Sequence, residues 1–135
     1  MSRQLSLFKG KRQHGLEPPP PLEVVVQCQV ARLLELNANK DWRWTHFPSG
    51  ELRDKITAKR LQDMGTKPGV PDLLLFSPTL LTHFLELKRK GGVVSDEQSD
   101  WADWCNAGGY PHAIAYGLDA AIAVLVHWGV LRVTL

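Results

Sequence analysis

Hydrophobic residues follow helical spacing in some segments of the chain and alternate like strands in others. Apolar positions recur every three or four residues from Leu22 to Asn37, which predicts a helix, although Val24-Val25-Val26 is β-prone. The later segments predict, in order, a strand over 42–47, a short helix over 54–64 ended by Gly65, strands over 72–76 and 82–88, a helix over 95–107, a strand over 112–116 and an apolar helix capped by Asp119.

The strands over 72–76 and 82–88 are joined by Ser77-Pro78-Thr79, which has the turn residues of a β-hairpin. A hairpin is too tight for the crossover that joins parallel strands, so a simple doubly wound fold fits the sequence less well. The order of elements instead predicts an α/β sandwich with a mixed central β-sheet flanked by helices.

A chain of 135 residues suits one compact domain and is too short for two. Residues 1–21 are polar and basic and end in four prolines, so we expect a flexible N-terminal arm before a single domain over 22–135. No apolar run has the roughly 18 to 20 residues of a membrane span, and no secretory signal is apparent. We therefore expect a cytoplasmic protein without a membrane partner.

Composition narrows the function only a little, because the net charge is +2 and does not by itself indicate a nucleic-acid partner. Cys28 and Cys105 have no second metal-binding residue at suitable spacing, so both are expected to be buried free thiols. The spacing of Trp42, Trp44, Trp101, Trp104 and Trp128 favours packing in the core over stacking on bases.

Charged residues interrupt the apolar hairpin: Asp72 opens its first strand, and Glu86 and Lys88 lie within the second. Residues two apart in a strand point to the same face, and hairpin pairing can bring Asp72 beside them. Two carboxylates about 4 Å apart repel by about 4 kcal/mol at an effective dielectric constant of about 20, which a divalent cation would offset. Oxygen ligands of this kind suit Mg²⁺ or Mn²⁺. Alternatively, the second strand is an edge strand whose Glu86 and Lys88 face solvent.

These residues carry a resemblance to a known family. Lys67-Pro68-Gly69-Val70-Pro71-Asp72-Leu73, Glu86-Leu87-Lys88, and Ser95 with Gln98 resemble the virus-type replication-repair nuclease (VRR-NUC) domain of the PD-(D/E)xK nuclease superfamily, over roughly residues 22–126. The resemblance implies a restriction-endonuclease-like core, divalent-metal catalysis, and branched or duplex DNA as the substrate.

The resemblance also assigns candidate site residues. Asp72 and Glu86 are the expected metal ligands, joined by Glu23 where the family has an acid in its first helix; Lys88 assists the attacking water. Glu23 also suits a helix N-terminus for electrostatic reasons alone. Gln98 has two interpretations, because it can close a capping box with Ser95 or face the site.

Five residues are candidates for DNA contacts: Lys67, His46, Arg53, Lys59 and Arg60. A solvated surface is the alternative for the cations, and a structural role is the alternative for His46. The family's His-x-Pro-Asn-Gly turn appears here over 46–50 with Ser49 in place of asparagine.

The sequence therefore predicts a Mg²⁺- or Mn²⁺-dependent DNA endonuclease without an organic cofactor, selective for Holliday junctions or other branched DNA, in a bacterium or a phage-infected cell. We expect a homodimer that places two sites on two strands and buries the apolar helix over 120–130. The alternatives are a catalytically silent DNA-binding or scaffold module, a sequence-specific restriction enzyme, and an exonuclease that trims flaps or duplexes.

Overall fold

The computed structural model describes residues 22–48 and 54–132. Its elements are α2 (Glu23–Asn37), β1 (Arg43–His46), α3 (Lys55–Asp63), β2 (Leu73–Phe76), β3 (Thr82–Lys88), α4 (Asp96–Gly108), β4 (His112–Tyr116) and α5 (Leu118–His127). The predicted N-terminal arm over 1–21 and the candidate DNA contact Arg53 lie outside the described residues. None of the helices within the described ranges is long and apolar enough to cross a membrane.

The four strands form one mixed sheet in the order β1-β2-β3-β4, which confirms the predicted fold class. β1, β2 and β3 pair antiparallel, and the predicted hairpin joins β2 to β3. β4 pairs parallel to β3 after the crossover through α4. Because β3 has a neighbour on each side, the edge-strand alternative for Glu86 and Lys88 is wrong.

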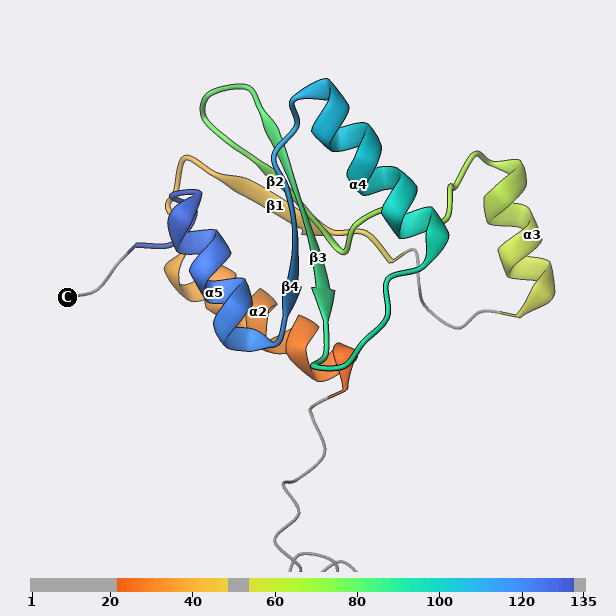
Figure 1. The fold of residues 1–135 in the computed structure, drawn as a ribbon, viewed down its shortest axis with the longest axis horizontal. Helices are drawn as coiled ribbons and strands as arrows, with labels where there is room; N and C mark the ends of the chain where they lie inside the picture. The colour runs from red at the N-terminus through yellow and green to blue at the C-terminus, as the bar shows by residue number, and fades with distance from the viewer. Residues whose placement is uncertain (1–21, 49–53, 133–135) are drawn as a thin grey trace, which may run out of the picture.

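Helices cover both faces of the sheet, with α2 and α5 on one side and α4 on the other (Figure 1). Alternation along β3 directs Leu85 and Leu87 into the core beneath α2 and α5. The same alternation directs Phe84, Glu86 and Lys88 toward the α4 side, where Phe84 contacts Trp101. The sheet thus separates an aliphatic layer from a layer that holds buried charge.

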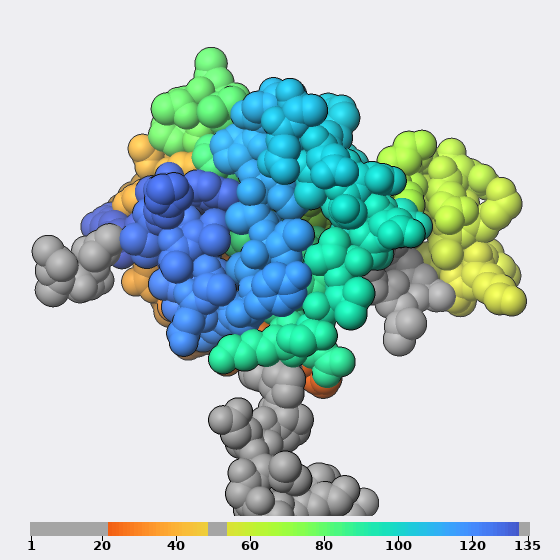
Figure 2. All heavy atoms as spheres, in the orientation of Figure 1, coloured from red at the N-terminus to blue at the C-terminus, as the bar shows by residue number. Residues whose placement is uncertain are grey.

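α3 stands apart from the rest of the molecule, as the ribbon and the space-filling view both show (Figures 1 and 2). It has no buried residue, and its N-terminus is capped by Asp54, whose side chain accepts a hydrogen bond from the Thr57 N–H at 2.7 Å. The formation of this helix therefore depends on its cap and not on packing against the sheet.

Three local predictions are wrong. Cys28 is exposed, because α2 buries only the stripe Val26, Val30 and Leu34, whereas Cys105 is buried as expected. Asp119 is not the cap of α5, since Gly117 with φ 91° turns the chain into the helix two residues earlier. Trp104 is 55% exposed instead of lying in the core.

Gly69 allows the loop before Asp72 to pack directly on the start of α4. It has φ +80°, and a Cβ there would overlap the backbone carbonyl of Glu97. Gly109, which ends α4, has the same φ of +80° but open space around a Cβ. A comparison of the two glycines therefore separates the cost of a left-handed backbone, which both share, from the cost of the steric overlap, which only Gly69 has.

We expect Gly69→Ala to lower the free energy of unfolding more than Gly109→Ala does. Both substitutions incur about 1–2 kcal/mol for a left-handed alanine, and only Gly69→Ala adds a steric cost of about 1–3 kcal/mol. Urea unfolding of the two variants beside the wild type measures the difference. Equal losses would show that the loop moves freely from α4.

Candidate metal centre

Asp72 and Glu86 lie side by side on the α4 face of the sheet. The pairing of Leu73 with Leu85 places Asp72 opposite Glu86 at the next position of the hairpin. The Leu87 N–H donates to Asp72 Oδ2 at 2.8 Å, which ties the Asp72 side chain to β3. Glu86 is only 3% exposed. The sequence pattern thus places a half-buried aspartate beside a buried glutamate.

Burial and mutual repulsion make this pair expensive to ionise. Burial and the nearby Asp72 carboxylate together raise the pKa of Glu86 to about 8, although the Lys88 ammonium group opposes the shift. Burial also raises the pKa of Asp72. Glu86 Oε2 is buried without a hydrogen-bond partner among the described residues. A buried carboxylate oxygen without a partner is costly, and coordination of a cation would remove that cost. Glu86 Oε2 is therefore suited to bind a metal ion.

Lys88 connects the acid pair to Glu23 on the other helical layer. Its Nζ lies 3.7 Å from Glu86 Oε1 and 3.9 Å from Glu23 Oε1, and its side chain is 6% exposed. Gly92 keeps this approach open, since a Cβ there would lie 3.2 Å from Glu23 Oε1. Glu23 therefore reaches the site around the end of the sheet, as a partner of Lys88.

Glu23 does not complete a compact three-acid cluster. Within residues 22–48 and 54–132, no three His, Cys, Asp or Glu side chains converge closely enough to hold a metal ion by themselves. Asp72 and Glu86 are a sufficient protein donor set for Mg²⁺, which retains several waters and is commonly held by one or two carboxylates and substrate phosphates. The donor set fits such an ion, and Glu23 is placed in its surroundings.

Gln98 fulfils both of its proposed roles at once. Its Oε1 accepts a hydrogen bond from the Ser95 N–H at 2.9 Å, and Ser95 Oγ accepts from the Gln98 N–H, which completes the capping box of α4. Its Nε2 donates to Glu86 Oε1 at 2.8 Å. The helix start therefore fixes one oxygen of Glu86 and leaves the other for a ligand.

Residues 30–119 match the VRR-NUC domain family. The chain belongs to this family. The match includes Asp72, Glu86, Lys88 and Gln98, whereas Glu23 lies before its start. The resemblance seen in the sequence motifs is thus confirmed for the part of the chain that carries the acid pair.

One solved structure supports the fold. A structure named VRR_NUC domain protein superposes with a TM-score of 0.61 at 19% identity and covers 86% of this chain and 100% of its own. A structure of paFAN1 bound to DNA with a 2-nucleotide 5′ flap and a gap shares 30% identity over 44% of this chain and 11% of its own, with a TM-score of 0.35. No curated protein is significantly similar to the chain.

The candidate DNA contacts occupy different surroundings in this VRR-NUC domain. His46 Nδ1 lies 2.8 Å from the Asp72 carbonyl oxygen, which also accepts from the Phe47 N–H at 2.8 Å. His46 thus has a structural contact with the motif backbone. Lys59 forms an exposed ion pair with Asp63 at 2.9 Å on α3, which also carries the exposed Arg60. Both cations therefore lie on the helix that stands apart from the sheet, and not within the acid pair.

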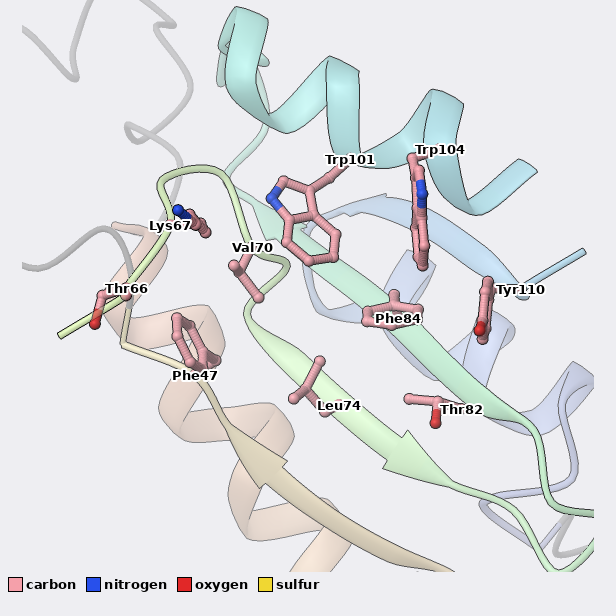
Figure 3. Close-up of a pocket in the computed structure, with 11 residues that line it drawn as sticks. Phe47, Thr66, Lys67, Val70, Leu74, Thr82, Phe84, Trp101, Trp104 and Tyr110 are labelled. Carbon is pink, nitrogen blue, oxygen red and sulfur yellow. The ribbon is translucent and has the colours of Figure 1, made fainter. Parts of the chain in front are cut away.

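An aromatic groove that the sequence did not predict lies on the same face of the sheet. Its volume is about 470 Å³. Its aromatic lining, which Figure 3 shows beside the loop with Lys67 and Val70, consists of Phe47, Phe84, Trp101, Trp104 and Tyr110. These residues come from four separate segments, so no local motif announces the groove. One signal was available, since Trp104 falls beside the helical stripe of Gln98, Trp101 and Cys105 and not on it.

We expect the metal-free protein to lose stability between pH 7 and pH 8. The folded chain keeps a proton on Glu86 up to about pH 8, whereas an unfolded glutamate, with its ordinary pKa of 4.5, has lost it. The folded state then binds more protons, so the free energy of unfolding falls as the pH rises, by at most about 1.4 kcal/mol per pH unit.

Urea unfolding in EDTA across this interval measures the slope. Burial lowers the pKa of His83 and His112, but their opposite contribution is nearly complete above pH 7, because their ordinary pKa is 6.5. Glu86→Gln should flatten the slope, and Glu35→Gln on the exposed side of α2 should keep it. A slope that survives Glu86→Gln would exclude Glu86 as its source.

Proposed function

We propose that this VRR-NUC domain is a Mg²⁺- or Mn²⁺-dependent DNA endonuclease that acts on branched DNA. The observation that carries the proposal is the pairing of the half-buried Asp72 with the buried Glu86, with the Lys88 Nζ 3.7 Å from Glu86 Oε1. A binding module has no need for two acids held together at this cost, whereas a phosphodiester hydrolase needs them to hold a cation against a phosphate.

Asp72 and Glu86 would hold the metal ion, which when bound lowers the pKa of a water and neutralises charge on the phosphate. Gln98 keeps Glu86 Oε1 turned toward α4, so that Oε2 faces the ligand. The Lys88 ammonium group orients the attacking water or stabilises the charge that develops on the phosphoryl oxygens. Glu23 restrains Lys88 from the side of α2.

Positive side chains would guide the DNA backbone past this centre. Lys67 lies on the loop before the acid pair, and Lys59 and Arg60 are exposed residues of α3, the helix that stands apart from the sheet (Figure 1). Arg53 and His46 complete the proposed set of contacts. Contacts of this kind position a duplex without reading its sequence. A domain of this size has little room for a separate sequence-reading element, which favours recognition of DNA structure in a cytoplasmic enzyme.

We expect Asp72→Asn and Lys88→Met to reduce cleavage of a labelled four-way junction in Mg²⁺ or Mn²⁺ by roughly 100-fold or more. Asparagine keeps the shape of Asp72 but removes its charge, and methionine keeps much of the length of Lys88. EDTA should stop the wild-type reaction. Glu35→Gln and Lys40→Met, which change exposed charges elsewhere, should leave the rate unchanged.

Each alternative function has its own outcome in this assay. Purified wild type that binds the junction but cuts no DNA would be a binding module. Products released only from DNA ends would indicate an exonuclease. Cutting at one short duplex sequence, with the junction otherwise intact, would indicate a restriction enzyme.

We further propose a homodimer, because one acid pair cuts one strand and a symmetric junction presents two. α5 offers little apolar surface for the predicted interface, because Ala121 and Leu125 are buried within the same chain and no large apolar side chain of α5 is exposed. The interface is therefore expected on another surface.

Sedimentation velocity should give twice the 15.1 kDa mass of the chain at micromolar concentration. Equimolar junction should then shift the whole dimer to a single complex. A species of one chain mass at all concentrations would contradict the dimer without affecting the assignment of the acid pair.

A further inference from the structure

The floor of the aromatic groove continues directly from the acid pair. Leu74 pairs with Phe84 across the hairpin, and both lie two residues along their strands from Asp72 and Glu86, on the same face. Two residues of a strand span about 6.6 Å, and successive nucleotides of one DNA strand are about 3.4 Å apart along the helix axis. A base within one or two nucleotides of a phosphate at the acid pair therefore reaches the groove.

The groove has the chemistry of a stacking platform. Trp104 is 55% exposed, and its ring stacks on Tyr110 with 5.0 Å between centroids and 14° between planes. Trp101 meets Trp104 edge-on at 5.9 Å and is fixed by a hydrogen bond from its Nε1–H to the Pro68 carbonyl oxygen at 3.1 Å. Rings held in this way offer a preformed apolar surface, and nucleobases stack on such surfaces irrespective of sequence.

Charge around the groove gives a nucleotide one orientation. Lys67 lines the rim beside the loop that leads to Asp72, where a phosphate backbone would pass. Asp100 does not line the groove but lies beside Trp101 and Trp104 in a neighbouring pocket, where its charge disfavours a phosphate. The apolar interior of the groove suits an uncharged ring.

We propose that the aromatic groove binds one unpaired nucleobase next to the scissile phosphate. A base inside a duplex has both faces covered by its neighbours and cannot enter such a site without leaving the stack, whereas an unpaired base at a branch, gap or flap enters at a lower cost. This inference rests on the proposed nuclease function and narrows its substrate to branched DNA with an unpaired nucleotide beside the cut.

The test uses a three-way junction with one unpaired 2-aminopurine at the branch and the same junction fully paired. Binding is measured by fluorescence titration in Mg²⁺, with the full chain carrying Asp72→Asn to suppress cleavage. We expect the probe to be quenched on binding. Adding Trp104→Ala should abolish the quenching and weaken binding of the unpaired junction about tenfold, with little change for the paired one.

Two matched variants separate stacking from general damage. Trp104→Phe keeps a stacking ring and should retain most of the affinity. Phe76→Ala removes an exposed aromatic ring on β2 that does not line the groove, and it should not change the binding of either junction. An equal effect of Trp104→Ala on both junctions, or no effect on either, would overturn the proposal. So would a Trp104→Ala protein whose main change is a lower mass in sedimentation, because the groove would then hold a second copy of the chain.

Cleavage by the chain without Asp72→Asn distinguishes this inference from the proposed function. If the protein binds the unpaired base through Trp104 but cuts no DNA, the proposed nuclease activity is wrong and the proposed base-binding role of the groove stands. If the protein cuts both junctions and Trp104→Ala changes neither rate, only the proposed base-binding role of the groove is wrong. Wild type that binds neither junction overturns both.

Discussion

The repulsion between two carboxyl groups, one buried and one half-buried, is the constraint around which this domain is organised. Asp72 and Glu86 face each other across a hairpin inside the sheet, where burial raises the pKa of both. Such a pair is tolerated only if the surrounding groups hold it in place and a cation or a proton offsets its charge. The contacts of the Leu87 N–H, Lys88 and Gln98 with the pair supply the first requirement.

Three segments that are distant from the hairpin or from one another in the sequence support this pair. Gln98 comes from the first turn of α4, Glu23 reaches Lys88 from the first turn of α2, and Gly69 lets the loop before Asp72 lie against α4. Trp101 adds a hydrogen bond to that loop at Pro68. The acid pair is thus positioned by helix starts and loop contacts, while the aliphatic core beneath α2 and α5 supports the sheet from its other face.

Much of this arrangement is predictable from the sequence because it rests on short-range rules. The hairpin follows from Ser77-Pro78-Thr79, the shared face of Glu86 and Lys88 follows from strand alternation, and the capping box of Ser95 and Gln98 follows from their spacing. The family was predicted from the motif residues around Asp72, Glu86 and Lys88, because composition and net charge alone do not distinguish one family from another. The second contact of Gln98 was harder to predict, because it depends on where α4 crosses the sheet.

The wrong predictions share a physical cause. Cys28 and Trp104 are apolar residues on helices, and helical spacing alone does not say how wide a stripe the neighbouring layer covers. α2 buries a single narrow stripe, and α4 buries only Cys105 completely. Asp119 has the chemistry of a helix cap, but Gly117 with its positive φ begins the turn first. In each case tertiary packing or backbone geometry outweighed a local preference.

The narrow contact of α4 with the sheet has a consequence for the site. A helix with one fully buried residue leaves a space between its outer aromatic rings and the floor formed by Leu74 and Phe84, and this space is the aromatic groove. The same helix carries Gln98, which holds Glu86. A single element therefore sets both the geometry of the acid pair and the width of the groove beside it. Filling that groove with additional aliphatic packing would stabilise α4 but would remove the apolar surface next to the acid pair. The incomplete packing of α4 is thus the arrangement expected of a site whose groove takes the proposed nucleobase, at a cost to the stability of the fold.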